Sequence, residues 1–367
     1  MPLLLRNQDV SSVLSMAPVM EVLETAFKDL YRGDAITAPR VDILSPSPKR
    51  NAIHGLKSMS GVVLSLGVGA VRTDSDLLQW PEINGAPRRV KLTTAQDSGV
   101  PIGKENGTVF LYSLETGAML SIIQDGHIQR LRVGGTSGLG VKYLARRNAR
   151  VAGILGSGWQ AEAQLLSLLV ARDITEVKVY SPNPSHREEF AKRMAEITGV
   201  FIRAVSSAED ATRNSDVVLI STNSKKPVIR AEWLEPGTHI GFIIRLEVDE
   251  ALLDRADILA TNVKDWGATK TYNYLVGGIN PDDIAEEDFV PGWWVNDSYW
   301  NKMRHLGGIM IGDVPGRTGE EQITCFYSKG MGLQFAAVGA LAYRLARKQG
   351  VGIELNDEWF LQDAYQK

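Results

Sequence analysis

The sequence predicts an α/β protein built on a doubly wound parallel sheet, with a second α/β unit that is discontinuous along the chain. An apolar run at residues 151–155 leads into a glycine-rich turn and then a helical pattern. Five further apolar runs follow, most of them separated by helix-period segments. Such alternation is typical of parallel strands joined by right-handed crossovers. The first 130 or so residues also combine strand and helix patterns, but they lack the glycine-rich turn.

The parallel sheet is expected to contain six strands, each a short apolar run suited to burial between helices. These strands lie at residues 151–155, 177–180, 200–204, 216–221, 239–244 and 257–261, and helices are expected at 163–170 and 187–198. The pattern predicts a Rossmann dinucleotide-binding domain over residues 136–317.

The turn Gly156-Ser157-Gly158-Trp159-Gln160-Ala161 has the spacing of a phosphate-binding fingerprint in its alanine-ended form. Gly156 permits the sharp turn, Gly158 lets a pyrophosphate approach the backbone, and Ala161 lets the helix pack on its strand. The free N–H groups at the start of the helix attract phosphate. We therefore expect these six residues to bind a dinucleotide. The alternative is a Rossmann-like domain that binds nothing at this turn.

The residues after the second strand bear on which dinucleotide binds. Folds that prefer NAD usually carry an acidic residue there for the ribose 2′-hydroxyl, whereas this chain has Ser181. Ser181 and Asn183 can donate hydrogen bonds to a 2′-phosphate, and His186 or Arg187 can neutralise its charge. The sequence favours NADP(H). NAD remains possible, since Arg187 could simply begin the next helix.

Further polar candidates follow the fourth and fifth strands. Thr222, Asn223 and Ser224 lie at the carboxyl edge of the sheet, where the cofactor is expected. Glu247 and Asp249 follow the fifth strand, and a carboxylate there can act as a general acid or base. Either residue could instead cap the next helix, which is the role we expect for Asp249.

The first unit and the tail are expected to form one domain, residues 1–135 and 318–367. Its expected elements are an amphipathic helix at 17–31 ended by Gly33, a glycine-interrupted apolar stretch at 62–71, a β-hairpin at 109–114 and 118–123, a helix that carries Arg132 and runs to about residue 146, a returning strand at 322–327 and a long helix at 333–348. Residues 75–107 are expected to form a surface insertion. Residues 272–300 are expected to form an aromatic loop that serves as pocket wall or subunit contact.

The composition excludes several classes of protein. A formal net charge of −3 with 23% charged residues provides no basic surface for nucleic acid. No apolar run reaches the length of a membrane span and the start is too short for a signal peptide, so we expect a cytoplasmic protein without a membrane partner. The single cysteine, Cys325, excludes an internal disulfide, and the scattered histidines show no metal-ligand spacing, so no metal is expected.

Three arginines of the first domain, Arg40, Arg72 and Arg132, each border an expected buried element. A guanidinium can bind a carboxylate in a bidentate manner, so two or three of them converging on a cleft would suit an amino or keto acid. The small residues at 133–138 would let a ligand come close to Arg132. The alternative for each arginine is a local surface salt bridge.

Together these motifs resemble the ornithine cyclodeaminase and mu-crystallin family over nearly the whole chain. They are, in order, Ala38-Pro39-Arg40, Gly117 with Asp125-Gly126, Leu131-Arg132 through Ala145-Arg146-Arg147-Asn148-Ala149, the turn at 156–161, Ser215-Asp216-Val217-Val218, Thr222-Asn223-Ser224-Lys225-Lys226-Pro227-Val228, Trp233-Leu234-Glu235-Pro236-Gly237-Thr238-His239, and Gly316-Arg317 before Ile323-Thr324. Their order and spacing carry the resemblance.

The resemblance implies a homodimer in which the two-part first domain binds the substrate and pairs across the interface. It also implies a bound nicotinamide whose reactive face meets an amino or imino acid. The family's carboxylate ligands correspond to Arg40, Arg72 (commonly lysine in other members) and Arg132. The family's Asp-Ser-x-Gly segment corresponds to residues 327–330 and adds Ser328 to the expected cofactor-binding residues.

The chain departs from true cyclodeaminases at acidic positions. The aspartate that assists deamination and ring closure there corresponds to Leu246, and two further family aspartates correspond to Tyr327 and Phe335. Lys57 lies near the place where cyclodeaminases carry a glutamate. These changes remove groups that would hold the cationic side chain of ornithine.

We therefore expect an NAD(P)-dependent oxidoreductase that acts on the C–N bond of a small amino or imino acid, as an imine reductase or an amino-acid dehydrogenase. The arginines would orient the substrate carboxylate. Lys57, Arg72 and Glu247 are the candidate catalytic residues, with Lys57 or Glu247 as the proton carrier. The alternatives are a cyclodeaminase-type ammonia lyase with tightly held NAD and a non-catalytic ligand-binding protein like some relatives of mu-crystallin.

Overall fold

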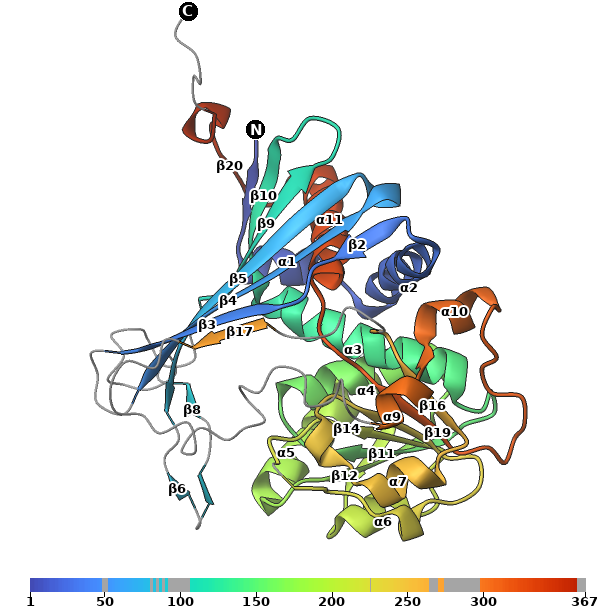
Figure 1. Ribbon diagram of the computed structural model, residues 1–367. Coiled ribbons are helices and arrows are strands. Elements are labelled where there is room, and N and C mark those ends of the chain that lie inside the picture. The colour runs from blue at the N-terminus through green and yellow to red at the C-terminus, as the bar shows by residue number, and fades with distance from the viewer. Residues whose placement is uncertain are drawn as a thin grey trace, which may run out of the picture.

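The computed structural model describes residues 1–47, 52–79, 106–224, 226–263 and 298–361. Outside these ranges it also gives the backbone of four short strands, which are β6 (Glu82–Ile83), β7 (Ala86–Pro87), β8 (Val90–Lys91) and β17 (Lys270–Asn273). The chain forms two lobes, each built on its own large sheet, with helix α3 (Asp125–Leu144) between them (Figure 1). The expected α/β class is confirmed.

The lower lobe of Figure 1 contains an eight-stranded sheet in the order β13-β12-β11-β14-β15-β19-β16-β18, and every neighbouring pair in it is parallel. Its strands are β11 (Val151–Leu155), β12 (Glu176–Tyr180), β13 (Phe201–Ala204), β14 (Val217–Ile220), β15 (His239–Phe242), β16 (Ile258–Thr261), β18 (Arg304–His305) and β19 (Thr324–Tyr327). The six strands expected from the apolar runs are all present. The strand order reverses beside β11, and sheets of this type bind ligands outside that point.

The described helices of this lobe include the two expected at 163–170 and 187–198, which begin a few residues earlier than expected. They are α4 (Trp159–Ala171), α5 (Pro184–Thr198), α6 (Ala208–Thr212), α7 (Glu250–Arg255), α9 (Ser298–Lys302) and α10 (Leu306–Ile311). Asn183 caps α5, and Asp249 caps α7 by accepting from the Leu252 amide, as expected. The cap of α4 is Gly158, whose position provides no side-chain acceptor for the amides of the first turn.

Strand β19 differs from the expected domain division. It pairs in parallel with both β15 and β16, so it lies inside the nucleotide-binding sheet, whereas the expected boundary at 317/318 assigns it to the first domain. Its residues are all buried, which is typical of a parallel strand covered on both faces, whereas β4 and β5 of the upper sheet alternate between buried and partly buried residues. The chain then crosses to the other lobe as α11 (Gly332–Gln349), which packs on the upper sheet as expected.

The upper lobe contains a mixed sheet in the order β17-β3-β4-β5-β9-β10-β1-β20, with β2 and β8 paired at its margins. Its strands are β1 (Leu3–Leu5), β2 (Ala35–Thr37), β3 (Val41–Pro46), β4 (Ile53–Val63), β5 (Val68–Gln79), β9 (Thr108–Ser113), β10 (Met119–Gln124) and β20 (Ile353–Glu354). Helices α1 (Asn7–Val13), α2 (Met16–Arg32) and α11 pack against it. The expected N-terminal helix, its end at Gly33 and the β9–β10 hairpin are confirmed.

The glycine-interrupted apolar stretch at 62–71 contains the end of β4, a turn and the start of β5. A short 3₁₀ turn, Leu64–Leu66, separates β4 from β5, and Gly67 takes a left-handed conformation with φ of +65°. Buried and partly buried residues alternate along both strands, as is usual for an antiparallel pair. The glycines in this stretch made the position of the turn between the strands hard to predict from the sequence. The expected insertion at 75–107 is also revised at its start, because β5 continues to Gln79. Residues 80–81 and 92–105, and residues 274–297 of the expected aromatic loop, lie outside the described residues.

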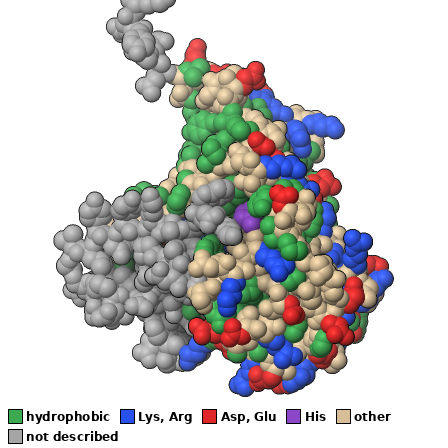
Figure 2. All heavy atoms as spheres, turned by 45° about the vertical axis from the view of Figure 1, so that its right-hand side comes forward, with side chains coloured by type: hydrophobic (Ala, Val, Ile, Leu, Met, Phe, Trp, Pro, Cys, Tyr) green, Lys and Arg blue, Asp and Glu red, His purple; other side chains and the backbone are tan. Residues whose placement is uncertain are grey.

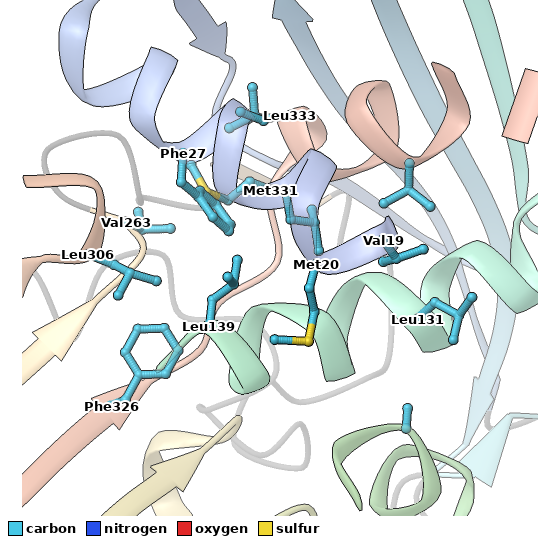
Figure 3. Packing of buried hydrophobic residues seen from close by; sticks show 14 of the residues in the cluster. Val19, Met20, Phe27, Leu131, Leu139, Val263, Leu306, Phe326, Met331 and Leu333 are labelled. Atoms are coloured by element: carbon cyan, nitrogen blue, oxygen red, sulfur yellow. The ribbon is translucent and has the colours of Figure 1, made fainter. Parts of the chain in front are cut away.

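Helix α3 is buried over most of its length and joins the two lobes. Met20 of α2, Leu139 of α3 and Phe326 of β19 belong to one apolar cluster that spans the junction (Figure 3). The small residues after Arg132 serve this packing: a Cβ at Gly134 would lie 2.5 Å from the Ala163 carbonyl oxygen of α4. The expectation that these glycines admit a ligand is therefore wrong, because they admit neighbouring helices.

Lys and Arg side chains are interspersed with Asp and Glu over the lower lobe on the face shown in Figure 2, in keeping with the small net charge. Within the described ranges, no individual helix has the length and apolar composition to cross a bilayer; α1 and α2, bent by 92° at their junction, meet that test only as a pair.

Candidate active site

The turn after β11 has the geometry expected of a phosphate-binding loop. Gly156 takes φ of +118°, and a Cβ there would collide with the carbonyl oxygen of Ser221, the residue after β14. The Gly156 amide donates to the Tyr180 carbonyl oxygen over 2.8 Å, which holds the turn against β12. At Gly158 a Cβ would meet no atom within 4 Å, so open space lies over this residue. Ala161 is fully buried where α4 meets its strand.

Buried polar atoms around this turn lack partners within the described part of the chain. They include Oε1 of Gln160, in the first turn of α4, and Oγ of Ser221, at the end of β14. A buried polar atom without a hydrogen bond costs about 1–3 kcal/mol, so such atoms usually mark a ligand or an ordered water. Together with the uncapped amides of α4 and the space over Gly158, they fit a bound dinucleotide.

The residues expected to select the dinucleotide gather beside the turn. The Ser157 hydroxyl donates to the Ser181 hydroxyl over 2.9 Å, and Arg187 donates from Nη1 to the Ser181 carbonyl oxygen over 2.9 Å. The Arg187 guanidinium also lies over the Tyr180 ring, 5.7 Å from its centroid. Asn183 is occupied in part, because its carboxamide oxygen accepts from the His186 amide as the cap of α5.

The residues after β14 are held by Glu247. Its Oε1 accepts from the amide of Thr222 over 2.6 Å and from the Thr222 hydroxyl over 2.9 Å. Its Oε2 accepts from the amides of Ile243 and Ile244, over 3.2 and 3.0 Å. The Ser224 amide in turn donates to Thr222 Oγ1 over 3.1 Å, while Asn223 lies between them on the same loop.

This geometry corrects the expectation that Glu247 carries protons. Its side chain is fully buried, its two oxygens together accept four hydrogen bonds, and it is absent from the cavity lining described below. Burial raises the pKa of Glu247, while the hydrogen bonds from Thr222 and from the backbone of Ile243 and Ile244 act to lower it. Glu247 therefore positions the loops that follow β14 and β15.

A cavity of about 490 Å³ lies between the two lobes, next to the dinucleotide turn. Trp159 and Gln160 line it from the start of α4, and Ile243 and Ser328 line it from the ends of β15 and β19. The opposite wall comes from the upper lobe and is basic. Arg40, Lys57, Arg72 and Arg132 all line the cavity, so the structure brings together the arginines that the sequence singled out.

Arg132 is a buried cation held by neutral side chains. Its Nη1 donates to Gln334 Oε1 over 2.9 Å and its Nη2 to Gln129 Oε1 over 2.6 Å. Its guanidinium lies 4.9 Å from the centroid of the Phe335 ring. Among the described residues, no carboxylate lies within salt-bridge distance of it. Burial and the positive charge of Arg72 lower the pKa of Arg132 to about 9, so the site would gain from an anionic ligand.

Arg72 and Arg40 already have carboxylate partners. Arg72 donates from Nε to Asp125 over 2.7 Å and lies 3.3 Å from Asp74, and these carboxylates raise its pKa although burial acts to lower it. Arg40 makes a bidentate pair with Asp42, with both distances 2.7 Å. Arg40 thus forms the local salt bridge that was the alternative to carboxylate binding, although its side chain also lines the cavity.

Lys57 projects from β4 into the same basic wall and is buried. Its ammonium pairs with Asp76 and lies 3.7 Å from Asp74. Asp74 and Asp76 are two residues apart on β5, so both side chains lie on the same face of the sheet. Together with Lys57 on β4 they form an ion-pair network next to the cavity.

Two cavity residues were missed as candidates by the sequence analysis. Tyr327 ends β19, stacks on Phe242 with ring centroids 5.0 Å apart, and has its pKa raised to about 12 by burial. Lys329 follows it on the next loop, and burial with the nearby charge of Arg40 lowers its pKa to about 6. The signal that could have indicated them is their position in the chain: Tyr327 is the last residue of a strand that belongs to the nucleotide-binding sheet, and Lys329 lies two residues beyond it.

Comparison with known proteins shows which family this chain resembles. The model of the ornithine cyclodeaminase/mu-crystallin family matches residues 91–349, which is more than half of the chain. The alanine dehydrogenase of Archaeoglobus fulgidus is 30% identical over 364 residues, covering 96% of this chain and 98% of the relative.

Two solved structures resemble this one over almost their whole length. The Thermococcus litoralis Δ¹-pyrroline-2-carboxylate reductase, in complex with NADH and L-proline, is 28% identical with a TM-score of 0.76, covering 96% of this chain and all of that one. An archaeal alanine dehydrogenase dimer with bound NAD is 26% identical with a TM-score of 0.75, covering 97% of this chain and 99% of that one. On this evidence the chain belongs to the ornithine cyclodeaminase/mu-crystallin family.

Proposed function

We propose that this protein is an NAD(P)-dependent oxidoreductase that acts on the C–N bond of a small amino or imino acid. One observation carries the proposal. The cavity that receives Trp159 and Gln160 from the dinucleotide turn also receives Arg132, a buried guanidinium whose polar partners are neutral amides. A cofactor site and a carboxylate site therefore share one space between the lobes.

In this scheme Arg132 binds the substrate carboxylate as its main charged partner, because the desolvated guanidinium has the most to gain from an anion. Arg72 and Arg40 contribute positive charge to the same wall. Fixing the carboxylate orients the neighbouring carbon–nitrogen bond, which lowers the entropic barrier to reaction. The nicotinamide, when bound, supplies or accepts the hydride that interconverts the imine and the amine.

The relatives support this class of substrate. An alanine dehydrogenase and a reductase bound to NADH and L-proline both handle a small molecule with a carboxylate next to a C–N bond. The residue that corresponds to the cyclodeaminase aspartate is Leu246 here, and its neighbour Glu247 is occupied by backbone amides. Neither of these two residues therefore offers the carboxylate that would favour the alternative ammonia-lyase reaction.

For the cofactor we propose a preference for NADP(H), with NAD(H) also accepted. Ser181 follows β12 at the place where an acidic residue would otherwise select the 2′-hydroxyl, and Arg187 Nη1 donates to the Ser181 carbonyl oxygen. A 2′-phosphate at this place would meet a hydroxyl and a guanidinium. The named structures with NADH or NAD show that relatives use the unphosphorylated form.

We also propose a homodimer that forms through the free face of the upper sheet. Helices α1, α2 and α11 pack against this sheet. Gly339 of α11 lies next to Leu111 and Ile123, so α11 covers the face on which these two buried side chains lie. On the other face Leu4, Ile122, Phe110 and Val71 are cross-strand neighbours and are only partly buried. A continuous apolar row of this kind suits a second copy of the same sheet. Sedimentation equilibrium of wild type and of Phe110→Asp tests it, with a dimer-to-monomer shift expected.

The activity test is an assay of NADPH and NADH oxidation by the purified protein. Substrates are Δ¹-pyrroline-2-carboxylate and pyruvate with ammonia or methylamine, and the reverse reaction uses L-proline and L-alanine. We expect turnover with at least one pair and a fall in kcat/KM of about 100-fold or more in Arg132→Met. Ammonia release without net change in the cofactor would favour the lyase, and dinucleotide binding without any turnover would favour a non-catalytic binding protein.

A further inference from the structure

Lys329 occupies a fixed place in the cavity wall. It is the second residue after β19, and fully buried Asn262, the first residue after β16, forms hydrogen bonds with its backbone N–H and C=O groups. Asn262 Nδ2 donates to the Lys329 carbonyl oxygen over 2.8 Å, and the Lys329 amide donates to Asn262 Oδ1 over 2.8 Å. Two neighbouring strands of the nucleotide-binding sheet therefore set the position from which this side chain lines the cavity.

The loop that carries Lys329 runs against the proposed carboxylate site. A Cβ built on the next residue, Gly330, would lie 2.7 Å from Arg132 Nη1, so the backbone passes directly beside that guanidinium. In an α-amino or α-imino acid the nitrogen is two bonds from the carboxylate carbon. A carboxylate bound at Arg132 therefore brings the substrate nitrogen close to the Lys329 segment, whereas the Glu247 side chain is absent from the cavity lining.

The charges around Lys329 weaken its hold on a proton. Among the described residues, the ionisable groups that face the same cavity are Arg40 from the segment between β2 and β3, Lys57 from β4, Arg72 and Asp74 from β5, Arg132 from α3, and Tyr327 from β19. Burial and Arg40 together lower the pKa of Lys329 to about 6, whereas burial raises that of Tyr327 to about 12. An amine in this setting changes protonation close to neutral pH, while the phenol stays protonated.

We propose that Lys329 is the catalytic proton carrier of this enzyme, exchanging a proton between its Nζ and the nitrogen of the substrate. The proposal rests on the proposed function. In the oxidative direction the C–N bond becomes C=N, the substrate hydride goes to the oxidised nicotinamide, and the amine proton goes to neutral Lys329. In the reductive direction the protonated Lys329 returns that proton as the hydride is added to the imine carbon.

This assignment replaces the two expected proton carriers with a third. Glu247 lies outside the cavity lining and is held by amide donors, and Lys57 pairs with Asp76 and Asp74. Lys57 thereby helps to form the basic wall, and Lys329 lines the cavity from the loop after β19, next to Ser328.

The first test measures the lysine itself and needs no substrate turnover. Wild-type protein is labelled with limiting acetic anhydride between pH 5 and 10, and mass spectrometry follows acetylation of Lys329 and of exposed Lys348 at the end of α11. We expect the reactivity of Lys329 to rise with a midpoint near pH 6, and the exposed Lys348 serves as the reference for how the reagent itself depends on pH. A midpoint above pH 9 for Lys329 would overturn the proposal.

The second test uses the substrate pair identified in the activity assay. In Lys329→Met we expect kcat to fall by about 100-fold or more, the KM for the carboxylate substrate to change less than about threefold, and the limb of the pH profile near 6 to disappear. Small primary amines added to the variant should restore part of the rate. Lys348→Met is the matched control. A Lys329→Met enzyme that keeps the wild-type kcat and pH limb would refute the role.

The two tests separate this proposal from the proposed function. If no substrate is turned over but Lys329 is acetylated with a midpoint near pH 6, the proposed function is wrong, while the lowered pKa of Lys329 is confirmed. If turnover is found and Lys329 behaves as an ordinary lysine, the function stands and the proton carrier is another residue.

Discussion

Arg132 and Gln334 meet in the buried junction between the lobes, where guanidinium Nη1 donates to the carboxamide oxygen over 2.9 Å. Gln334 is fully buried and its amide group donates onward to Thr136 Oγ1 over 2.7 Å. A glutamate of the same size at this place would neutralise the arginine. Because Gln334 is uncharged, it accepts a hydrogen bond from Arg132 without neutralising the positive charge of the guanidinium in the cavity.

Replacing that acceptor should reduce substrate binding. In Gln334→Glu the new carboxylate pairs with Arg132 and competes with the substrate, so we expect the KM for the carboxylate substrate to rise about 10-fold or more. Gln349→Glu, which adds the same charge at the exposed end of α11, is the control. Steady-state kinetics with both variants make the comparison, and an unchanged KM in Gln334→Glu would argue against Arg132 as the carboxylate ligand.

The two glycines of the dinucleotide turn should respond differently to alanine. Gly158→Ala adds a methyl group to open space, so we expect wild-type stability and a loss of NADH or NADPH affinity of about 10-fold or more. Gly156→Ala forces a side chain onto a φ of +118° and against the Ser221 carbonyl oxygen, so we expect destabilisation of more than about 1 kcal/mol. Urea unfolding and fluorescence titration measure the two effects. A Gly158→Ala protein that binds the dinucleotide normally would place the phosphates elsewhere.

An acidic residue after β12 should change the choice of cofactor. Ser181→Asp puts a carboxylate where a 2′-phosphate is expected to lie, so we expect the ratio of kcat/KM for NADPH to that for NADH to fall about 10-fold or more. Ser11→Asp, on exposed α1 in the other lobe, controls for added charge. If the ratio does not move, the phosphate does not contact this position.

Glu247 should prove to be a positioning residue. Glu247→Gln keeps the size of the side chain but substitutes a donor for one of two oxygens that face amide and hydroxyl donors, so we expect a loss of stability of about 1–3 kcal/mol. Because Glu247 is absent from the cavity lining, the midpoints of the pH profile should stay where they are. Thermal unfolding and pH–rate profiles give both readouts, and a vanished pH limb would return Glu247 to a catalytic role.

His239 should make the fold sensitive to mild acid. It is fully buried between strands of the parallel sheet, its Nδ1 lies 2.8 Å from Thr324 Oγ1, and burial with the charges of Arg317 and Arg172 lowers its pKa to about 3. The unfolded histidine titrates near 6.5, so its contribution to stability is complete above pH 6.5 and is lost as the pH falls from there toward 3. The loss approaches about 1.4 kcal/mol per pH unit below 6.5.

The measurement for His239 is urea unfolding between pH 4.5 and 8 for wild type and His239→Gln. We expect the stability of the wild type to fall more steeply below pH 6.5 than that of the variant, so that the two curves converge in acid. Parallel curves over this range would show that His239 does not take up a proton on unfolding.

Much of the fold follows from local patterns in the sequence. Six strands of the nucleotide-binding sheet, the turn at 156–161 and the cap at Asp249 were predictable because each depends on residues close together in the chain. The same holds for Gly33, which ends α2 in a left-handed conformation, and for the β9–β10 hairpin. Backbone sterics and hydrophobic periodicity act over a few residues and can be read without the fold.

The partners of the charged side chains could not be read in this way. Arg40, Arg72 and Arg132 looked alike in sequence, yet two of them meet aspartates while Arg132 meets Gln129 and Gln334. Glu247 looked like a free carboxylate after a strand and is instead surrounded by amides. A charge acts on whatever folding brings near it, and burial then decides how strongly.

The sequence alone thus determined the nucleotide-binding sheet, its phosphate turn and the set of basic residues available for a carboxylate. Only the tertiary structure decided that β19 joins this sheet, and so that Lys329 and Tyr327 enter the cavity beside Arg132. The physical reason is that strand pairing and burial link residues far apart in the chain, and these links set both the distances between ionisable groups and the water around them.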